Sequence, residues 1–124
     1  MSLRVLSSFK CGSFRLRFLQ GNIARWQGDC IVNAANTQLV QSTLTAYWRH
    51  EGRKDVNTAI HTQAGSGLAE ECSLLPCVTV SNTADDRVAS APDSDAPIRC
   101  PRGEARITSG HFLDAKHVIH AVGP

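Results

Sequence analysis

Two asparagines that follow a short apolar run are the residues of this sequence best suited to bind a polar ligand. The run is Cys30 to Val32, and Asn33 and Asn36 come directly after it with only two alanines between them. A carboxamide donates and accepts hydrogen bonds without carrying charge, so this pair suits ribose hydroxyls and phosphate oxygens. Small neighbours would also let a ligand approach the backbone closely. The alternative, that both asparagines only cap a turn or a helix, stays open.

The apolar run itself predicts a strand that is buried on both faces. Cys30 to Val32 is too short for a helix and is bounded by Gly28-Asp29 and by Asn33. In open α/β sheets, ligands bind beyond the carboxyl ends of the strands. We therefore expect Asn33 and Asn36 to lie at a ligand-binding edge.

Four blocks of sequence occur in an order that is typical of one family. The blocks are Val32-Asn33-Ala34-Ala35-Asn36 preceded by Gly21-Asn22-Ile23, Ala59-Ile60-His61 with Ala64-Gly65, Cys100 to Gly110, and Val118 to Pro124. Together they cover most of residues 14–124, and they resemble the macrodomain family of ADP-ribose-binding and ADP-ribosyl-hydrolysing modules. The resemblance implies a three-layer α/β/α fold with a mixed sheet, here expected to be incomplete at the C-terminus.

The resemblance also implies which residues bind ADP-ribose. Asn22 stands where the family commonly has an aspartate that accepts a hydrogen bond from the adenine amino group, and Ile23 follows it with a backbone amide near the ring. A neutral amide accepts more weakly than a carboxylate. Asn33 and Asn36 would bind the ligand, with Asn36 orienting the distal ribose. Asn22 could instead serve only the turn after Gly21.

Three residues are implied in catalysis by the same resemblance: Asn36, Asn57 and His61. Asn57 stands at the place of the family aspartate that holds or activates water, and a carboxamide cannot act as a general base near pH 7. His61 matches a histidine near the distal ribose and is a conceivable substitute base. A histidine satisfied by packing is an equally good interpretation of His61.

Residues 40–56 depart most from the family pattern. Relatives carry a run of glycines there, whose bare amides wrap the diphosphate, whereas this stretch contains only Gly52. The basic residues Arg49, Arg53 and Lys54 could contact phosphate instead, although a solvated basic loop is the more usual outcome.

Helical spacing returns after this loop. Asn57 is expected to be an N-cap, and Ile60, Ala64, Leu68 and Cys72 recur on one helical face. The stretch Gly65-Ser66-Gly67 predicts a break into two helices.

The N-terminal part predicts an extension followed by a strand. Phe14, Leu16 and Phe18 alternate with arginines and are expected to face the core. Residues 1–13 are expected to be an N-terminal extension, and the basic, serine-containing composition up to residue 28 leaves open a mitochondrial targeting segment that ends before Phe14.

Residues 81–97 read as a flexible insertion, rich in Asp, Ala and Pro and poor in large apolar residues. Its aspartates lack the spacing of a calcium loop. Cys72 and Cys77 could suggest zinc with His61 or His111, but a second Cys or His pair is missing, so no metal site is predicted. No cofactor is expected.

Two further strands are predicted near the end of the sequence. Arg106 to Thr108 and Lys116 to Val122 flank turn residues, and the second is an apolar run suited to a central parallel strand. We expect this last strand to lack neighbours, which would leave an uncovered surface that favours self-association.

Composition limits the function further. The 124 residues contain 42% hydrophobic and 19% charged residues and carry a net charge of +2, values that fit one globular domain and do not favour a nucleic-acid partner. Neither a membrane span nor a disulfide framework is predicted, because no long apolar run is present and the 5 cysteines are spaced irregularly. An intracellular protein, cytoplasmic or nuclear, or mitochondrial if a targeting segment is present, fits best. Its expected partner is ADP-ribose or an ADP-ribosylated protein.

Three hypotheses of function remain. The first is an ADP-ribose-binding macrodomain with weakened hydrolysis of ADP-ribosyl esters or O-acetyl-ADP-ribose. The second is a reader without catalysis, and the third is a degenerate domain without a ligand. Because the retained blocks include the site as well as the core, the first hypothesis is preferred.

Overall fold

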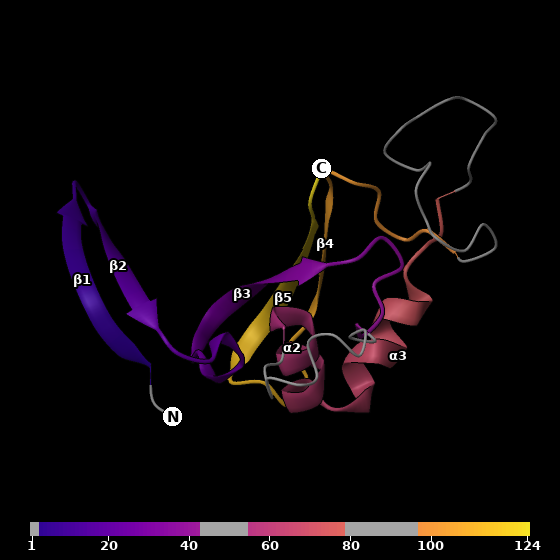
Figure 1. Ribbon diagram of the computed structural model, residues 1–124, viewed down its shortest axis with the longest axis horizontal. Helices are drawn as coiled ribbons and strands as arrows, with labels where there is room; N and C mark the ends of the chain where they lie inside the picture. Colours follow the sequence, from indigo (N-terminus) through magenta and orange to yellow (C-terminus); the bar gives the residue numbers. More distant parts are fainter. Residues whose placement is uncertain (1–2, 43–54, 79–96) are drawn as a thin grey trace.

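The computed structural model describes residues 3–42, 55–78 and 97–124 (Figure 1). Most of the divergent loop 40–56, with Arg49, Arg53 and Lys54, lies outside the described residues, and so does nearly all of the predicted insertion 81–97. The elements in chain order are β1 (Arg4–Cys11), β2 (Phe14–Gln20), η1 (Ile23–Arg25), β3 (Gly28–Ala35), α2 (Val56–Ala64), α3 (Ser66–Leu74), β4 (Ala105–Ser109) and β5 (Ala115–Val122).

The strands form two separate sheets. β1 and β2 make an antiparallel hairpin, while the second sheet has three strands in the order β3-β5-β4. β5 runs parallel to β3 and antiparallel to β4, so the second sheet is mixed, as predicted. The α/β class with a mixed sheet is therefore confirmed.

The core lies between the three-stranded sheet and the two helices. Ile60, Ala64, Leu68 and Cys72, which the sequence places on one helical face, are all buried to within 1% of full burial. The predicted break falls at Gly65, whose φ of 78° is a conformation that glycine adopts without strain. None of the helices in the described ranges is long and apolar enough to cross a membrane.

β3 is buried on one face only, which corrects the expectation of burial on both. Ile31 and Asn33 point into the core, whereas Val32 between them is exposed. Val32 pairs with Ile119 of β5, and Ile119 pairs with Ile107 of β4. This apolar row crosses all three strands on the face opposite the buried one, because side chains alternate between the faces of a strand.

The hairpin also differs from the prediction. Residues 4–11, expected to belong to an extension, form β1 and pair with β2. Phe14, Leu16 and Phe18 are 65%, 45% and 53% exposed rather than buried. The physical reason is visible in Figure 1, where the hairpin stands apart from the three-stranded sheet.

The last strand is not uncovered, which corrects a further expectation. β5 lies in the middle of its sheet and is paired along both edges. Val118 and His120 on its inner face are completely buried. Within the described residues, β1, β2, β3 and β4 each have one edge without a neighbouring strand.

Candidate ligand site at the ends of the central strands

Asn36 follows β3 directly, and its side chain stabilises the next turn through two hydrogen bonds. Its Nδ2 donates to the carbonyl oxygen of Val40 at 2.8 Å, and its Oδ1 accepts from the amide of Val40 at 3.1 Å. The turn buries Leu39, which adopts a φ of 57°. Asn36 remains half-buried beside the carboxyl end of the parallel β3–β5 pair. The side chain therefore reaches the predicted ligand edge, where it shapes a loop.

Asn57 lies in the first turn of α2 and joins this helix to the same loop. Its Oδ1 accepts from the amide of Ser42 at 2.8 Å, while its Nδ2 is buried without a partner among the described residues. Thr58 adds a long contact from its hydroxyl to the Ser42 carbonyl, at 3.5 Å. The loop after β3 is thus hydrogen-bonded to the N-terminal turn of α2.

The N-cap of α2 is Asp55, so the prediction that Asn57 caps this helix is wrong. Asp55 Oδ1 accepts from the amide of Thr58 at 2.7 Å. A carboxylate also interacts favourably with the positive end of the helix dipole. Burial acts to raise the pKa of Asp55, but hydrogen bonds from Thr58 and Ser42 outweigh it and lower that pKa.

Asn33 lies inside the core, where its side chain has no exposed surface. Its Nδ2 contacts Nδ1 of His120 at 3.1 Å, and Thr108 Oγ1 contacts Nε2 of the same imidazole at 2.9 Å. Asn33 Oδ1 has no partner within the described ranges. This burial corrects the expectation that Asn33 faces a ligand directly, because a sealed side chain offers no surface to one.

His61 is 5% exposed and lies against His120, with 6.4 Å between the ring centroids. Desolvation by burial lowers the pKa of His61, so the imidazole is neutral at physiological pH. Its Nε2 is buried and has no hydrogen-bond partner in the part of the chain that is described.

Asn22 serves a local role in the turn before η1. Its Oδ1 accepts from the amide of Ala24 at 3.0 Å and caps this short helix. This contact matches the turn alternative, and the Asn22 side chain is exposed. Ile23 follows as the first residue of η1.

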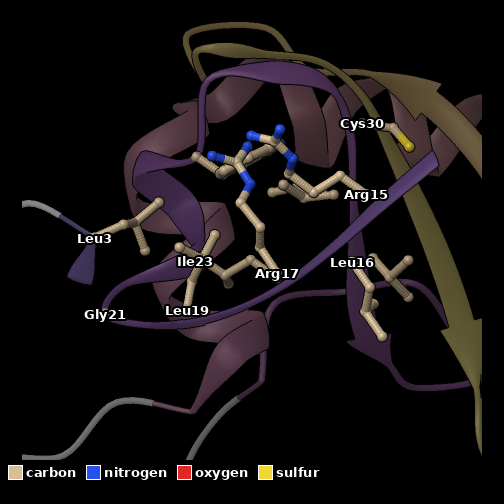
Figure 2. Close-up of a pocket in the computed structure, with 11 residues that line it drawn as sticks. Leu3, Arg15, Leu16, Arg17, Leu19, Gly21, Ile23 and Cys30 are labelled. Atoms are coloured by element: carbon tan, nitrogen blue, oxygen red, sulfur yellow. The ribbon is translucent and has the colours of Figure 1, made fainter. Parts of the chain in front are cut away.

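A cavity of about 540 Å³ lies between β2 and β3 (Figure 2). Its lining combines apolar side chains with two arginines, and includes Arg15, Leu16, Arg17, Ile23, Trp26 and Val32. Arg17 lies over the Trp26 ring, with Cζ 5.8 Å from the centroid. Ile23 is the only predicted site residue among the lining residues of this cavity.

The structure brings the predicted residues into two groups. Asn36 and Asn57 meet around the loop after β3, whereas Asn33 and His61 meet inside the core beside His120. Asn22 and Ile23 lie near the hairpin. Sequence reasoning missed Thr108 and His120 as partners of Asn33. The available signal was the alternation of Val118, His120 and Val122, which predicts an inward-facing histidine.

These features define an α/β domain whose polar groups gather where the central strands end and the next helix begins, a usual position for a nucleotide-type ligand. A family model described as "Macro domain" matches residues 32–124. The chain belongs to the Macro domain family.

Similar proteins agree with this assignment. A macro domain-containing protein of Methanosarcina mazei is 37% identical over 110 residues, which cover 89% of this chain and 41% of the relative. The ADP-ribose glycohydrolase MACROD1 of Rattus norvegicus is 34% identical over 89% of this chain and 30% of its own length. The Oceanobacillus iheyensis macrodomain with ADP superimposes with a TM-score of 0.66 and 25% identity, covering 100% of this chain and 51% of that structure. This chain therefore spans less than half the length of either curated relative.

Proposed function

We propose that this chain binds ADP-ribose, free or attached to a protein, beyond the carboxyl ends of β3 and β5. Family membership supports this function, as do a similar rat protein named as an ADP-ribose glycohydrolase and a similar macrodomain that holds ADP. One observation carries the proposal most directly. Asn36 and Asn57 are tied to the same loop, through Val40 and Ser42, at the point where α2 begins.

Each site residue then has a proposed role. Asn36 orients the distal ribose, because it is half-buried and its amide stands at the strand end. Asn22 and Ile23 bind the adenine, with Asn22 using the side-chain atoms that the Ala24 amide leaves free. Asn33 acts beneath the ligand by fixing His120, since its side chain is sealed in the core.

Hydrolysis is proposed as a weak second activity, directed at ADP-ribosyl esters or O-acetyl-ADP-ribose. Asn57 has no titratable proton near pH 7, so it positions water by hydrogen bonding and does not remove a proton. Its Nδ2 is buried and has no partner among the described residues, so the water that it would hold is a buried one. His61 is neutral and able to accept a proton, but its burial separates it from bulk water. Slow turnover follows, with the phosphate of the ligand assisting the water.

Titration with ADP-ribose in a calorimeter tests the proposal. The chain should bind, and Asn36→Ala should weaken binding about tenfold through the loss of a polar contact. Gln63→Ala is the matched control, because Gln63 is an exposed carboxamide on α2. Absence of binding by the unmodified chain would reject the function in favour of a degenerate domain. Equal affinities of the two variants would reject only the role of Asn36.

Asn57→Asp separates the enzyme from the reader. A carboxylate at this position should raise the rate of O-acetyl-ADP-ribose hydrolysis, because it supplies the missing acid-base group. Unchanged binding with no gain in hydrolysis would support a reader. Mass spectrometry of the product is the measurement.

Within the described residues, one edge of β2 and one edge of β3 have no neighbouring strand, which supports self-association of the isolated chain, because unpaired strand edges readily pair with another copy. An intracellular, reducing compartment is proposed from the five cysteines, all of which are free thiols. Light scattering and fractionation of cells test these two points separately.

A further inference from the structure

Three buried polar atoms on α2 and β3 have no hydrogen-bond partner among the described residues. They are Oδ1 of Asn33 on β3, and Nδ2 of Asn57 and Nε2 of His61 on α2. The three residues are only 0%, 2% and 5% exposed. A buried polar atom without a partner destabilises a fold, so native proteins usually satisfy such atoms with other protein groups or with ordered water. These atoms therefore call for a ligand that reaches them inside the core.

Asn33 and His61 both lie beside the imidazole of His120 on β5. Asn33 Nδ2 is 3.1 Å from His120 Nδ1, and the ring centroids of His61 and His120 are 6.4 Å apart. The other nitrogen of His120, Nε2, lies 2.9 Å from Thr108 Oγ1. Both nitrogens of His120 are thus occupied, so this ring cannot serve as the partner of His61.

Asn57 and His61 lie on one face of α2. Residues four apart in a helix are neighbours, with about 5–6 Å between their Cβ atoms. Asn57 uses its Oδ1 for the amide of Ser42 at 2.8 Å, which leaves Nδ2 for the core. Asn57 and His61 make no direct bond through these two atoms. One water that forms two hydrogen bonds of about 2.9 Å would span such a separation.

The polarity of the three atoms matches that of a water molecule. Asn57 Nδ2 donates, Asn33 Oδ1 accepts, and a neutral imidazole accepts through one nitrogen. Burial lowers the pKa of His61, which keeps this imidazole neutral. A water can accept from Asn57 and donate its two hydrogens to Asn33 and His61, the three bonds that an internal water typically makes. With the Asn33 amide turned around, Nδ2 would donate to the second lone pair of the same water.

We propose that Asn33, Asn57 and His61 form a binding site for one internal water molecule, which links α2 to β3. The site lies beneath the loop after β3, because the third bonding group of this region, Asn57 Oδ1, reaches the Ser42 amide of that loop. The water stabilises the packing of α2 on the sheet by satisfying groups of both elements at once. Its binding does not depend on ADP-ribose, and only its use in hydrolysis would rest on the proposed function.

A crystal structure of the ligand-free chain, at a resolution that shows ordered water, tests the site directly. A water should lie about 2.7–3.2 Å from the Asn33 amide, from Asn57 Nδ2 and from His61 Nε2. Magnetic relaxation dispersion of the solvent oxygen nuclei tests it in solution. This water should be counted as long-lived, because a molecule sealed in the core leaves only when the structure opens.

Matched histidine substitutions assign the long-lived water to this site. His61→Phe removes the polar atom and fills the space with an apolar ring, so the variant should have one long-lived water fewer than the unmodified chain. His117→Phe is the control, because His117 is exposed on β5, and it should leave the number unchanged. Circular dichroism verifies that both variants fold. If His61→Phe does not fold, the two measurements on the unmodified chain still decide the question.

Three results would overturn the proposal. The first is a crystal structure in which the three atoms bond to protein groups, or in which no single water contacts all three residues. The second is the absence of a long-lived water from the unmodified chain. The third is an equal number of long-lived waters in folded His61→Phe and His117→Phe. A chain that failed to bind ADP-ribose would leave these measurements unaffected, so this proposal and the proposed function fail separately.

Discussion

Asn33 and His120 contact each other through a fully buried pair of nitrogens, Nδ2 and Nδ1, although they are 87 positions apart in the sequence. Thr108 Oγ1 lies 2.9 Å from the other ring nitrogen, so both imidazole nitrogens have a polar partner. The Cys72 thiol lies 3.8 Å from that same nitrogen. This arrangement links β3, β4, β5 and α3 at one point, and a buried network of this kind stabilises a fold only while its members are satisfied.

Asn33→Ala should therefore destabilise the chain. The substitution removes the partner of His120 Nδ1, and an unsatisfied buried polar atom costs about 1–3 kcal/mol. The free energy of unfolding from urea denaturation measures the change. Cys30→Ala, on the exposed side of the same strand, is the control and should change the free energy by less than about 0.5 kcal/mol. Equal effects of the two substitutions would contradict the role of Asn33.

Stability should depend on pH through His120. Desolvation, with a smaller contribution from His61, lowers the pKa of His120 from 6.5 to about 4. Between these values the unfolded chain binds the proton and the folded chain does not. His120 therefore leaves the free energy of unfolding unchanged above pH 6.5. As the pH drops from 6.5 toward 4, the free energy of unfolding falls by about 1.4 kcal/mol per pH unit. His61, whose pKa burial also lowers, acts in the same direction.

Urea denaturation at a series of pH values measures this dependence. His120→Gln should flatten the profile between pH 4 and 6.5, because it removes the group that takes up the proton on unfolding. His117→Gln is the control, since His117 is exposed on the same strand. An identical slope in all three proteins would show that His120 does not titrate as described.

Removal of the α2 cap should also cost stability. Asp55→Ala leaves the Thr58 amide without its acceptor, and the loss of an N-cap costs about 1 kcal/mol. Asp55→Asn should retain most of the stability, because asparagine caps comparably. The carboxylate contribution is present above the ordinary Asp pKa of 3.8 and is lost as the pH falls through the lower folded value. If Asp55→Asn and the unmodified chain lost unfolding free energy equally as the pH fell below 3.8, the carboxylate of Asp55 would not be the source of that loss.

The buried and exposed cysteines should differ in their rate of alkylation. Burial, with the charge of Glu71, raises the pKa of Cys72 to about 11, and burial also raises the pKa of Cys100. Because the thiolate is the reactive form, both should resist iodoacetamide in the folded chain. The exposed Cys30 and Cys77 should be alkylated first. Mass spectrometry of peptides measures the modification, and labelling in urea is the control that should remove the difference.

Local patterns explain what could be predicted. The spacing of Ile60, Ala64, Leu68 and Cys72 predicts two helices with a buried face, and this prediction is confirmed. The runs around Ile107 and Ile119 predict the two last strands correctly. These predictions succeed because side-chain periodicity depends only on the repeat of each element.

Long-range packing explains what could not be predicted. The alternation of Phe14, Leu16 and Phe18 identifies a strand, but whether that face is buried depends on what lies opposite, and the hairpin stands apart from the sheet. The orientation of the Asn33 side chain could not be predicted for the same reason. Its position at the end of an apolar run suggested a ligand contact, whereas the pairing of β3 with β5 turns it toward His120.

The sequence by itself thus determined the kinds of element and the order of the Macro domain blocks, and it predicted Asn36 and Asn57 as candidate site residues. Only the tertiary structure decided that Asp55 rather than Asn57 caps α2, that Asn33 is buried in the core, and that β2 and β3 each have an unpaired edge among the described residues. The physical reason is that repeat patterns are properties of neighbouring residues, whereas burial and strand pairing depend on segments that the sequence keeps far apart.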